Sequence, residues 1–151
     1  MSSTPATQDQ QVLITRIFDA PRELVFAAWT DPDQVALWFG PENFDTPRDR
    51  VEIDLRVGGR YSLMMVQRES GREAPAEYEI VELDPPRLLV LRAKPMPEYG
   101  IDKATVTRVE LHDHGGKTRM TLSDGPYTDA GGAEAGWNGA FAKLERVVAP
   151  S

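Results

Sequence analysis

After a first alternating segment at Val12–Phe18, the spacing of hydrophobic residues changes twice along this chain, and these changes constrain the fold more than any other feature. Helical spacing precedes Phe44, alternation dominates from Phe44 to Asp124, and helical spacing then returns. Alternation indicates strands with one buried face, whereas spacings of three and four residues indicate amphipathic helices. Short helices, a run of strands and a final helix are typical of an α+β domain with an antiparallel sheet.

The final helical segment, Asp129–Val148, is predicted to be the longest helix. Asp129 is a suitable N-cap residue, and Pro150 follows the segment at a position where a helix cannot continue. Glycines lower the helix propensity of this segment. They are Gly131, Gly132, Gly136 and Gly139. Two interpretations remain open: the glycines allow close packing against a sheet, or they leave room for a ligand beside Trp137 and Phe141.

The alternating segments predict seven strands, and two short helices follow the first of them. The strands are Val12–Phe18, Arg50–Val57, Arg60–Gln67, Glu77–Leu83, Arg87–Ala93, Ala104–His112 and Lys117–Ser123. One short helix begins near Pro21, and the other spans Pro32–Trp38. Gly58-Gly59 predicts a tight hairpin in which at least one glycine has a positive φ. Met1–Gln10 is expected to be a disordered tail, and residues 11–151 are expected to form a single domain.

Composition excludes several classes of function. The chain has 151 residues, a net charge of −7 and no cysteine. The acidic balance argues against a nucleic-acid partner, which requires a basic surface, and against an anionic membrane surface. No apolar run reaches the roughly 20 residues that span a bilayer. The polar N-terminus lacks a signal-peptide core, so a cytoplasmic location is expected.

Residues that carry catalysis or hold metals are scarce. His112 and His114 bracket a predicted turn without a third ligand, so no metal site is predicted. Ser123-Asp124 has no histidine at a recognisable spacing. Nucleophile-elbow, phosphate-loop and dinucleotide-binding motifs are absent from the sequence. We therefore assign no catalytic residue, no metal and no cofactor from the sequence.

Five stretches resemble a known family. The first is F-D-A-P-R-E-L-V-F-A-A-W-T-D-P-D-Q-V-A-L-W-F-G-P, at Phe18–Pro41. The others are R-V-G-G-R-Y (Arg56–Tyr61), D-P-P-R-L (Asp84–Leu88), G-G-K-T-R-M-T-L (Gly115–Leu122) and G-W-N-G-A-F-A-K-L (Gly136–Leu144). In this order they resemble bacterial proteins similar to the C-terminal domain of the activator of heat-shock protein 90 ATPase.

The resemblance implies the helix-grip fold, which START lipid-transfer domains, pollen-allergen-like proteins and polyketide cyclases share. In that fold a curved antiparallel sheet grips a long C-terminal helix, with a cavity between them. The resemblance does not imply one activity, because a fold hosts many functions.

The predicted cavity would be lined by the inward faces of the helix and strands and by aromatic residues at its mouth. These candidate ligand-binding residues are Trp38, Phe39, Phe44, Tyr61, Leu63, Met65, Tyr78, Ile80, Trp137 and Phe141. Such a lining suits a small apolar or aromatic molecule. We expect Trp137 to border the cavity with Phe141, Tyr61 and Tyr78. The alternative is that these side chains simply fill the core.

Three functions follow as hypotheses. The first is non-catalytic binding of a small hydrophobic or aromatic molecule. The second is a co-chaperone-like interaction module that contacts a chaperone, as the family name suggests. The third is an enzyme related to the polyketide cyclases, in which Arg16, Arg108, Tyr61 or Tyr78 would move a proton. The oligomeric state is left open between monomer and homodimer.

Overall fold

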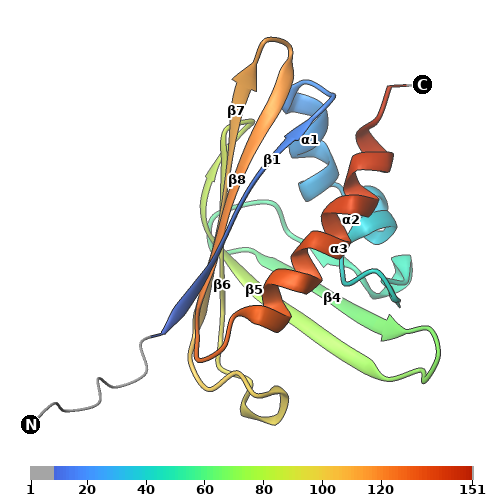
Figure 1. Cartoon of the computed structure of the whole chain (residues 1–151), viewed down its shortest axis with the longest axis vertical. Helices are drawn as coiled ribbons and strands as arrows, with labels where there is room; N and C mark the ends of the chain where they lie inside the picture. The colour runs from blue at the N-terminus through green and yellow to red at the C-terminus, as the bar shows by residue number, and fades with distance from the viewer. Residues whose placement is uncertain (1–8, 151) are drawn as a thin grey trace, which may run out of the picture.

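The computed structural model describes residues 9–150, which form a curled antiparallel sheet and three α-helices (Figure 1). The strands are β1 (Gln10–Phe18), β2 (Phe44–Asp45), β3 (Glu52–Ile53), β4 (Arg60–Gln67), β5 (Glu73–Asp84), β6 (Leu88–Ala93), β7 (Thr105–His114) and β8 (Lys117–Tyr127). The α-helices are α1 (Arg22–Thr30), α2 (Pro32–Trp38) and α3 (Gly131–Val148). Two short 3-10 helices span Arg48–Arg50 and Pro97–Tyr99. The predicted α+β class is confirmed.

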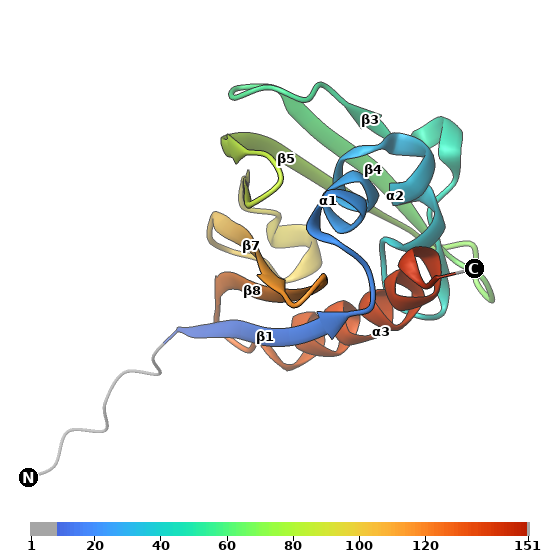
Figure 2. The same ribbon diagram turned by 90° about the horizontal axis from the view of Figure 1, so that it is seen from above.

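The sheet follows one path of seven strands, in the order β1-β8-β7-β6-β5-β4-β2, and β3 pairs with β4 beside that path. All its pairings are antiparallel. Figure 2 shows the sheet curling around α1, α2 and α3, which lie on its concave side. The long helix α3 packs against α2, β1 and α1. The prediction of a long C-terminal helix gripped by a curved sheet is therefore confirmed.

Alternation of buried and exposed residues explains β8 and its neighbour β1. In β8 the inward residues Thr118, Met120 and Leu122 are buried, as expected for a strand with one face on the core. This alternation continues beyond the predicted end at Ser123, because β8 remains paired with β1 and β7. The first predicted strand is confirmed and begins earlier, at Gln10. The rest of the predicted tail, apart from Asp9, lies outside the described residues.

The prediction of a strand over Arg50–Val57 was wrong over most of its length. Only Glu52–Ile53 pairs with β4, and Leu55 and Val57 are 45% and 61% exposed. The reason is the backbone of the glycine pair. Gly58 donates its N–H to the Ile80 carbonyl, and Gly59 accepts from the Ile80 N–H, so both glycines lie beside β5.

The glycine pair nevertheless has the conformation that the sequence predicts at one position. Gly58 has a φ of 84°, which confirms the expected positive φ. Gly59 is restricted by a different cause, since an added Cβ would lie 2.0 Å from the Asp54 carbonyl oxygen. The chain therefore needs glycine at 58 for its dihedral angle and at 59 for close backbone packing.

The start of α3 differs from the prediction by one residue. Ala130 occupies the N-cap position and makes no side-chain cap hydrogen bond. Asp129, the predicted cap, accepts from the Gly131 N–H at 2.9 Å from just outside the helix. The Ala130 N–H donates to Gln10 Oε1 at 2.8 Å, which ties the helix start to β1.

An aromatic cluster joins the three helices to the sheet. The Trp29 ring of α1 is fully buried and lies 4.7 Å from Trp38, 5.8 Å from Trp137 and 6.1 Å from Phe141. The Tyr61 hydroxyl of β4 donates to the Trp29 carbonyl at 2.6 Å. Burial of such large rings supplies much of the apolar driving force for folding. The cluster fixes the position of α3 against the concave face.

Candidate functional site

A pocket of about 180 Å³ lies between the N-terminal half of α3, the loop after α2, and strands β4, β5 and β8. We call it the α3 pocket. It opens to solvent, and most of its lining is apolar or aromatic. Its lining residues are Phe39, Gly40, Pro41, Met65, Tyr78, Asp124, Tyr127, Gly132, Ala133, Gly136, Trp137 and Ala140.

The pocket contains one carboxylate, that of Asp124, whose side chain is held by three neutral donors. Its Oδ1 accepts from the Thr107 hydroxyl at 2.9 Å. Its Oδ2 accepts from the Tyr127 hydroxyl at 2.6 Å and from Trp137 Nε1 at 2.8 Å. Asp124 is only 2% exposed. We call these four residues the Asp124 cluster, and all three donors suit a carboxylate, which only accepts.

The charge of Asp124 acts on the tyrosines around it. Burial raises the pKa of Tyr127, and the negative charge of Asp124 raises it further. The pKa of Tyr78 is raised by the same two causes, burial first. Both tyrosines therefore remain neutral phenols near neutral pH. Among the described residues that line the α3 pocket, none is a lysine, arginine or histidine.

Trp137 connects the pocket to the aromatic cluster. Its indole stacks on Phe141 with 5.5 Å between the ring centroids, as expected for residues four apart on one helix face. Its Nε1 atom faces Asp124 on β8. The indole is 8% exposed, so one side is packed and a small part borders the pocket. The expectation that Trp137 faces the sheet is confirmed.

The glycines of α3 do not share one role. Gly132 and Gly136 line the pocket, and an added Cβ at Gly132 would meet nothing within 4 Å. Gly139 instead lies against the loop after α2, because its Cβ would approach the Glu42 backbone nitrogen to 2.8 Å. The interpretation of close packing therefore describes Gly139, with the loop rather than the sheet as the contacting surface. Open space is found at Gly132.

The sequence-predicted site residues fall into three groups. Four line the α3 pocket: Phe39, Met65, Tyr78 and Trp137. Five belong to the buried core and do not line it: Trp38, Tyr61, Leu63, Ile80 and Phe141. Phe44 lies elsewhere, in β2, beside a smaller hollow that Lys143 also lines. The predicted grouping of Trp137 with Tyr78 is found in the pocket lining, whereas Tyr61 and Phe141 pack behind it.

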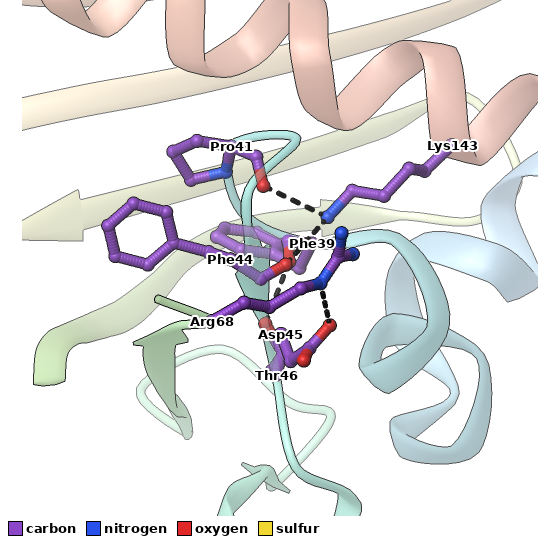
Figure 3. A network of polar contacts seen from close by, with 7 residues as sticks. All are labelled: Phe39, Pro41, Phe44, Asp45, Thr46, Arg68 and Lys143. Atoms are coloured by element: carbon purple, nitrogen blue, oxygen red, sulfur yellow. Dashed lines mark hydrogen bonds and ion pairs between the residues drawn. The ribbon is translucent and has the colours of Figure 1, made fainter. Parts of the chain in front are cut away.

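A second polar group holds the loop that forms one wall of the pocket (Figure 3). Lys143 reaches from α3 and donates to the carbonyls of Pro41 and Phe44, at 3.1 and 3.2 Å. Nearby, Arg68 donates to Asp45 at 2.9 Å. Burial lowers the pKa of Lys143, and the positive charge of Arg68 adds to the effect. We call these five residues the Lys143 cluster.

Sequence reasoning missed Asp124 and Tyr127 as pocket residues. The available signal was the alternation of β8, where Asp124 follows Met120 and Leu122 on the inward face. A carboxylate at such a position must have partners, since burying an unpaired charge is costly. Thr107, its opposite neighbour in the β7–β8 register, is one of them.

Of the four residues suggested for proton transfer, only Tyr78 lines the pocket. Arg16 pairs with Glu145 at 3.3 Å, and Arg108 pairs with Glu110 at 3.1 Å. Tyr61 is fully buried, and burial raises its pKa. The geometry therefore brings no cationic proton donor from this set to the pocket.

Together, the curled sheet, the long C-terminal helix and the pocket between them define a helix-grip domain. Residues 19–149 match the family described as Activator of Hsp90 ATPase homolog 1-like protein. The chain belongs to this family. The resemblance that the sequence motifs carry is thereby confirmed.

Solved structures share this fold. A crystallised protein of Chromobacterium violaceum superposes with a TM-score of 0.82 at 23% identity, over 93% of this chain and 98% of that one. The AHSA1-like protein of Aeromonas hydrophila gives 0.76 at 22% identity, over 92% of each chain. CalU16 of Micromonospora echinospora gives 0.67 at 24% identity, over 99% of this chain and 82% of that one. At these identities the likeness shows a common fold.

A comparison with curated proteins finds no match. Within residues 9–150, no helix combines the length and the apolar character needed to cross a lipid bilayer.

Proposed function

We propose that the α3 pocket binds a small hydrophobic or aromatic molecule without transforming it. The observation that supports this most directly is the lining: the side chains of Trp137, Phe39, Tyr78 and Met65 surround a hollow on the concave side of the sheet. Apolar walls with few polar groups are characteristic of small-molecule sites. Met65 adds a flexible side chain that can adapt to ligand shape.

The size of the pocket limits the ligand. Its volume of about 180 Å³ is below the range of roughly 300 to 1,000 Å³ that is usual for drug-sized ligands. It is close to the roughly 150 Å³ of an apolar cavity that holds benzene. We therefore expect a ligand with about one ring inside the pocket, with any further part of the molecule extending toward solvent.

Binding is favoured over acid–base catalysis by the ionisable groups of the pocket. A group that transfers protons near neutral pH works best with a pKa close to that pH. Burial and the Asp124 charge raise the pKa values of Tyr78 and Tyr127 instead. These two phenols are therefore better suited to fixed hydrogen bonds than to proton transfer.

The test uses two variants of one helix. Ala133 lines the α3 pocket. Ala135 is exposed and lies outside that pocket, in a separate groove that Glu42 and Asn43 also line. Ala133→Leu should fill the pocket, and Ala135→Leu adds the same volume outside it. Toluene, indole and benzyl alcohol serve as ring-sized probes. Binding is followed by the NMR resonance of the Trp137 indole N–H, which points at the pocket carboxylate.

We expect at least one neutral ring compound to shift the Trp137 resonance in a saturable way in the wild type and in Ala135→Leu. Ala133→Leu should remain folded and lose the response. The Trp38 indole N–H donates to the Ala28 carbonyl at 2.8 Å in the core and provides an internal reference. The proposal is refuted if saturable binding survives in Ala133→Leu. It is also refuted if neither a neutral ring compound nor an aromatic amine such as benzylamine shifts the Trp137 resonance.

A further inference from the structure

The Asp124 carboxylate has a feature that neutral ligands do not explain. It is almost completely buried, and within residues 9–150 no ion pair includes it. Its contacts are two hydroxyls and one indole N–H, all of them neutral. Buried charges are usually paired with an opposite charge or a metal, because desolvation is costly. Here no residue between 9 and 150 supplies the opposite charge.

We propose that the ligand of the α3 pocket carries a protonated amine, which approaches Asp124 while its apolar ring contacts Trp137 and Phe39. This inference rests on the proposed function and adds the chemical class of the ligand. The ammonium group would supply the positive charge that no described lining residue supplies. The net charge of −7 would also attract a cation toward the protein.

The hydrogen-bond geometry leaves capacity for one more donor. A carboxylate offers about four acceptor sites. Three are used by Thr107, Tyr127 and Trp137, and Oδ1 accepts only from Thr107. By this count, one acceptor site of Asp124 is left for an ammonium N–H. Charge-assisted hydrogen bonds of this kind are about twice as strong as neutral ones.

The aromatic lining favours the same chemistry. Trp137, Tyr78 and Phe39 line the pocket near the carboxylate. The face of an aromatic ring attracts cations, and the indole does so most strongly. An anionic ligand would be repelled, because it would approach the negative charge of the Asp124 carboxylate. The pocket is therefore expected to rank amines above neutral rings and neutral rings above acids.

The experiment compares four compounds of similar size on the wild-type protein: benzylamine, benzyl alcohol, toluene and benzoate. Titrations are followed by the indole N–H resonances of the three tryptophans, since only Trp137 donates to Asp124. We expect benzylamine to bind at least about tenfold more tightly than benzyl alcohol, with benzoate the weakest. Because this series requires no mutation, it does not depend on the folding of a variant.

Two variants locate the effect. Asp124→Asn should reduce benzylamine affinity to that of benzyl alcohol, since the charge is removed and one acceptor oxygen is kept. Ala133→Leu should abolish binding of both compounds, which excludes amine binding to acidic surface residues. If Asp124→Asn does not fold, the wild-type ranking and the Ala133→Leu result still decide the question.

The outcomes separate the inference from the proposed function. If toluene or benzyl alcohol binds as tightly as benzylamine, the amine inference is overturned and the apolar binding function stands. If benzylamine binds equally to wild type and Ala133→Leu, its site lies elsewhere and the inference is again overturned. If none of the four compounds moves the Trp137 resonance, both the inference and the proposed function fail for ligands of this size.

Discussion

The two polar clusters beside the α3 pocket hold the same helix by opposite means. In the Asp124 cluster a buried carboxylate on β8 accepts from neutral donors, one of them Trp137 of α3. In the Lys143 cluster a half-buried ammonium of α3 donates to two backbone carbonyls of the loop after α2 (Figure 3). One cluster joins α3 to the sheet, and the other joins α3 to the loop.

Their charges are compensated differently. Lys143 lies near Asp45 and Glu42, whose negative charges partly offset the effects of burial and of Arg68 on its pKa. Asp124 has no cationic contact among the described residues. Burying a charge without an opposite charge is costly, so the Asp124 carboxylate has a reason to attract a cationic ligand. The Lys143 ammonium already has negative charges nearby and needs no ligand to compensate it. The comparison supports the proposed ligand recognition by the Asp124 cluster, whereas the hydrogen bonds of the Lys143 cluster hold the pocket wall.

The largest expected effect comes from removing the buried carboxylate. Asp124→Ala would leave the Thr107 hydroxyl, the Tyr127 hydroxyl and the Trp137 indole N–H without their acceptor. Each unsatisfied buried donor costs about 1 to 3 kcal/mol, so we expect a loss of about 3 to 5 kcal/mol. Urea denaturation measures this loss.

The matched control is Asp45→Ala in the Lys143 cluster. The Asp45 side chain is 62% exposed and pairs with Arg68 at the surface. Such pairs contribute about 0 to 1 kcal/mol. If Asp124→Ala and Asp45→Ala lower the free energy of unfolding equally, the greater burial of Asp124 does not make it more important for stability.

Alkaline pH should change the stabilising contributions of the two tyrosines near Asp124 and of Lys143 in opposite directions. The pKa values of Tyr78 and Tyr127 are raised, so the folded state keeps protons that the unfolded chain releases above about pH 10. Their stabilising contribution is complete below that pH and declines above it, by up to about 1.4 kcal/mol per pH unit for each tyrosine. The pKa of Lys143 is lowered, so its contribution becomes more favourable as pH rises toward about 10.4.

Urea midpoints between about pH 8 and pH 11 test these signs. Tyr127→Phe should make the loss of stability with rising pH shallower, because phenylalanine has no proton that the folded state retains. Lys143→Met should make it steeper, because the opposing contribution disappears. An identical pH profile in the wild type and both variants would contradict the assignment of these shifts to the two clusters.

A third prediction concerns the close approach between α3 and the loop. The Cβ of Gly139→Ala would lie 2.8 Å from the Glu42 backbone nitrogen. The loop cannot easily yield, because Lys143 holds the carbonyls of Pro41 and Phe44 on both sides of Glu42. We expect a net loss of about 1 to 2 kcal/mol by urea denaturation, since overpacking outweighs the gain in helix propensity. The loss should be smaller in a Lys143→Met background, where the loop is released.

Much of the fold follows from the sequence, because burial of one sheet face imposes a period of two that is easily read. The error at Arg50–Val57 shows the limit of that argument. Alternation of Val51, Ile53, Leu55 and Val57 favours a strand, but backbone pairing decides it. There the glycines pair with Ile80 in β5, and only Glu52–Ile53 of the predicted strand forms a strand.

The site was less predictable for a physical reason. Phe39, Met65, Tyr78 and Trp137 were found because aromatic and apolar residues on inward faces gather around any hollow in a core. Asp124 was considered only as part of a catalytic triad, although its place on the inward face of β8 required partners. Lys143 gives no local signal, since its partners Pro41 and Phe44 lie about a hundred residues away in the sequence.

Removing the loop anchor should have a moderate effect. Lys143→Met keeps the aliphatic part of the side chain and removes the two hydrogen bonds to the Pro41 and Phe44 carbonyls. Because the ammonium is half-buried, we expect a loss of only about 1 kcal/mol. Hydrogen exchange should increase in residues 41–46 and remain unchanged in β8. Faster exchange in β8 instead would mean that the two clusters are not separate supports.

The smallest expected effect has the opposite sign and lies at the pocket end of α3. Gly132 is in the first turn of the helix, and an added Cβ would meet no atom within 4 Å. Gly132→Ala should therefore stabilise the protein by about 0.5 to 1 kcal/mol, because alanine loses less backbone entropy in a helix. The same change at Gly139 is destabilising, so the two substitutions form a matched pair on one helix. If Gly132→Ala raises stability but weakens ring binding, the glycine is kept for the space it leaves in the pocket; if it lowers stability, the helix start is packed more tightly than its geometry indicates.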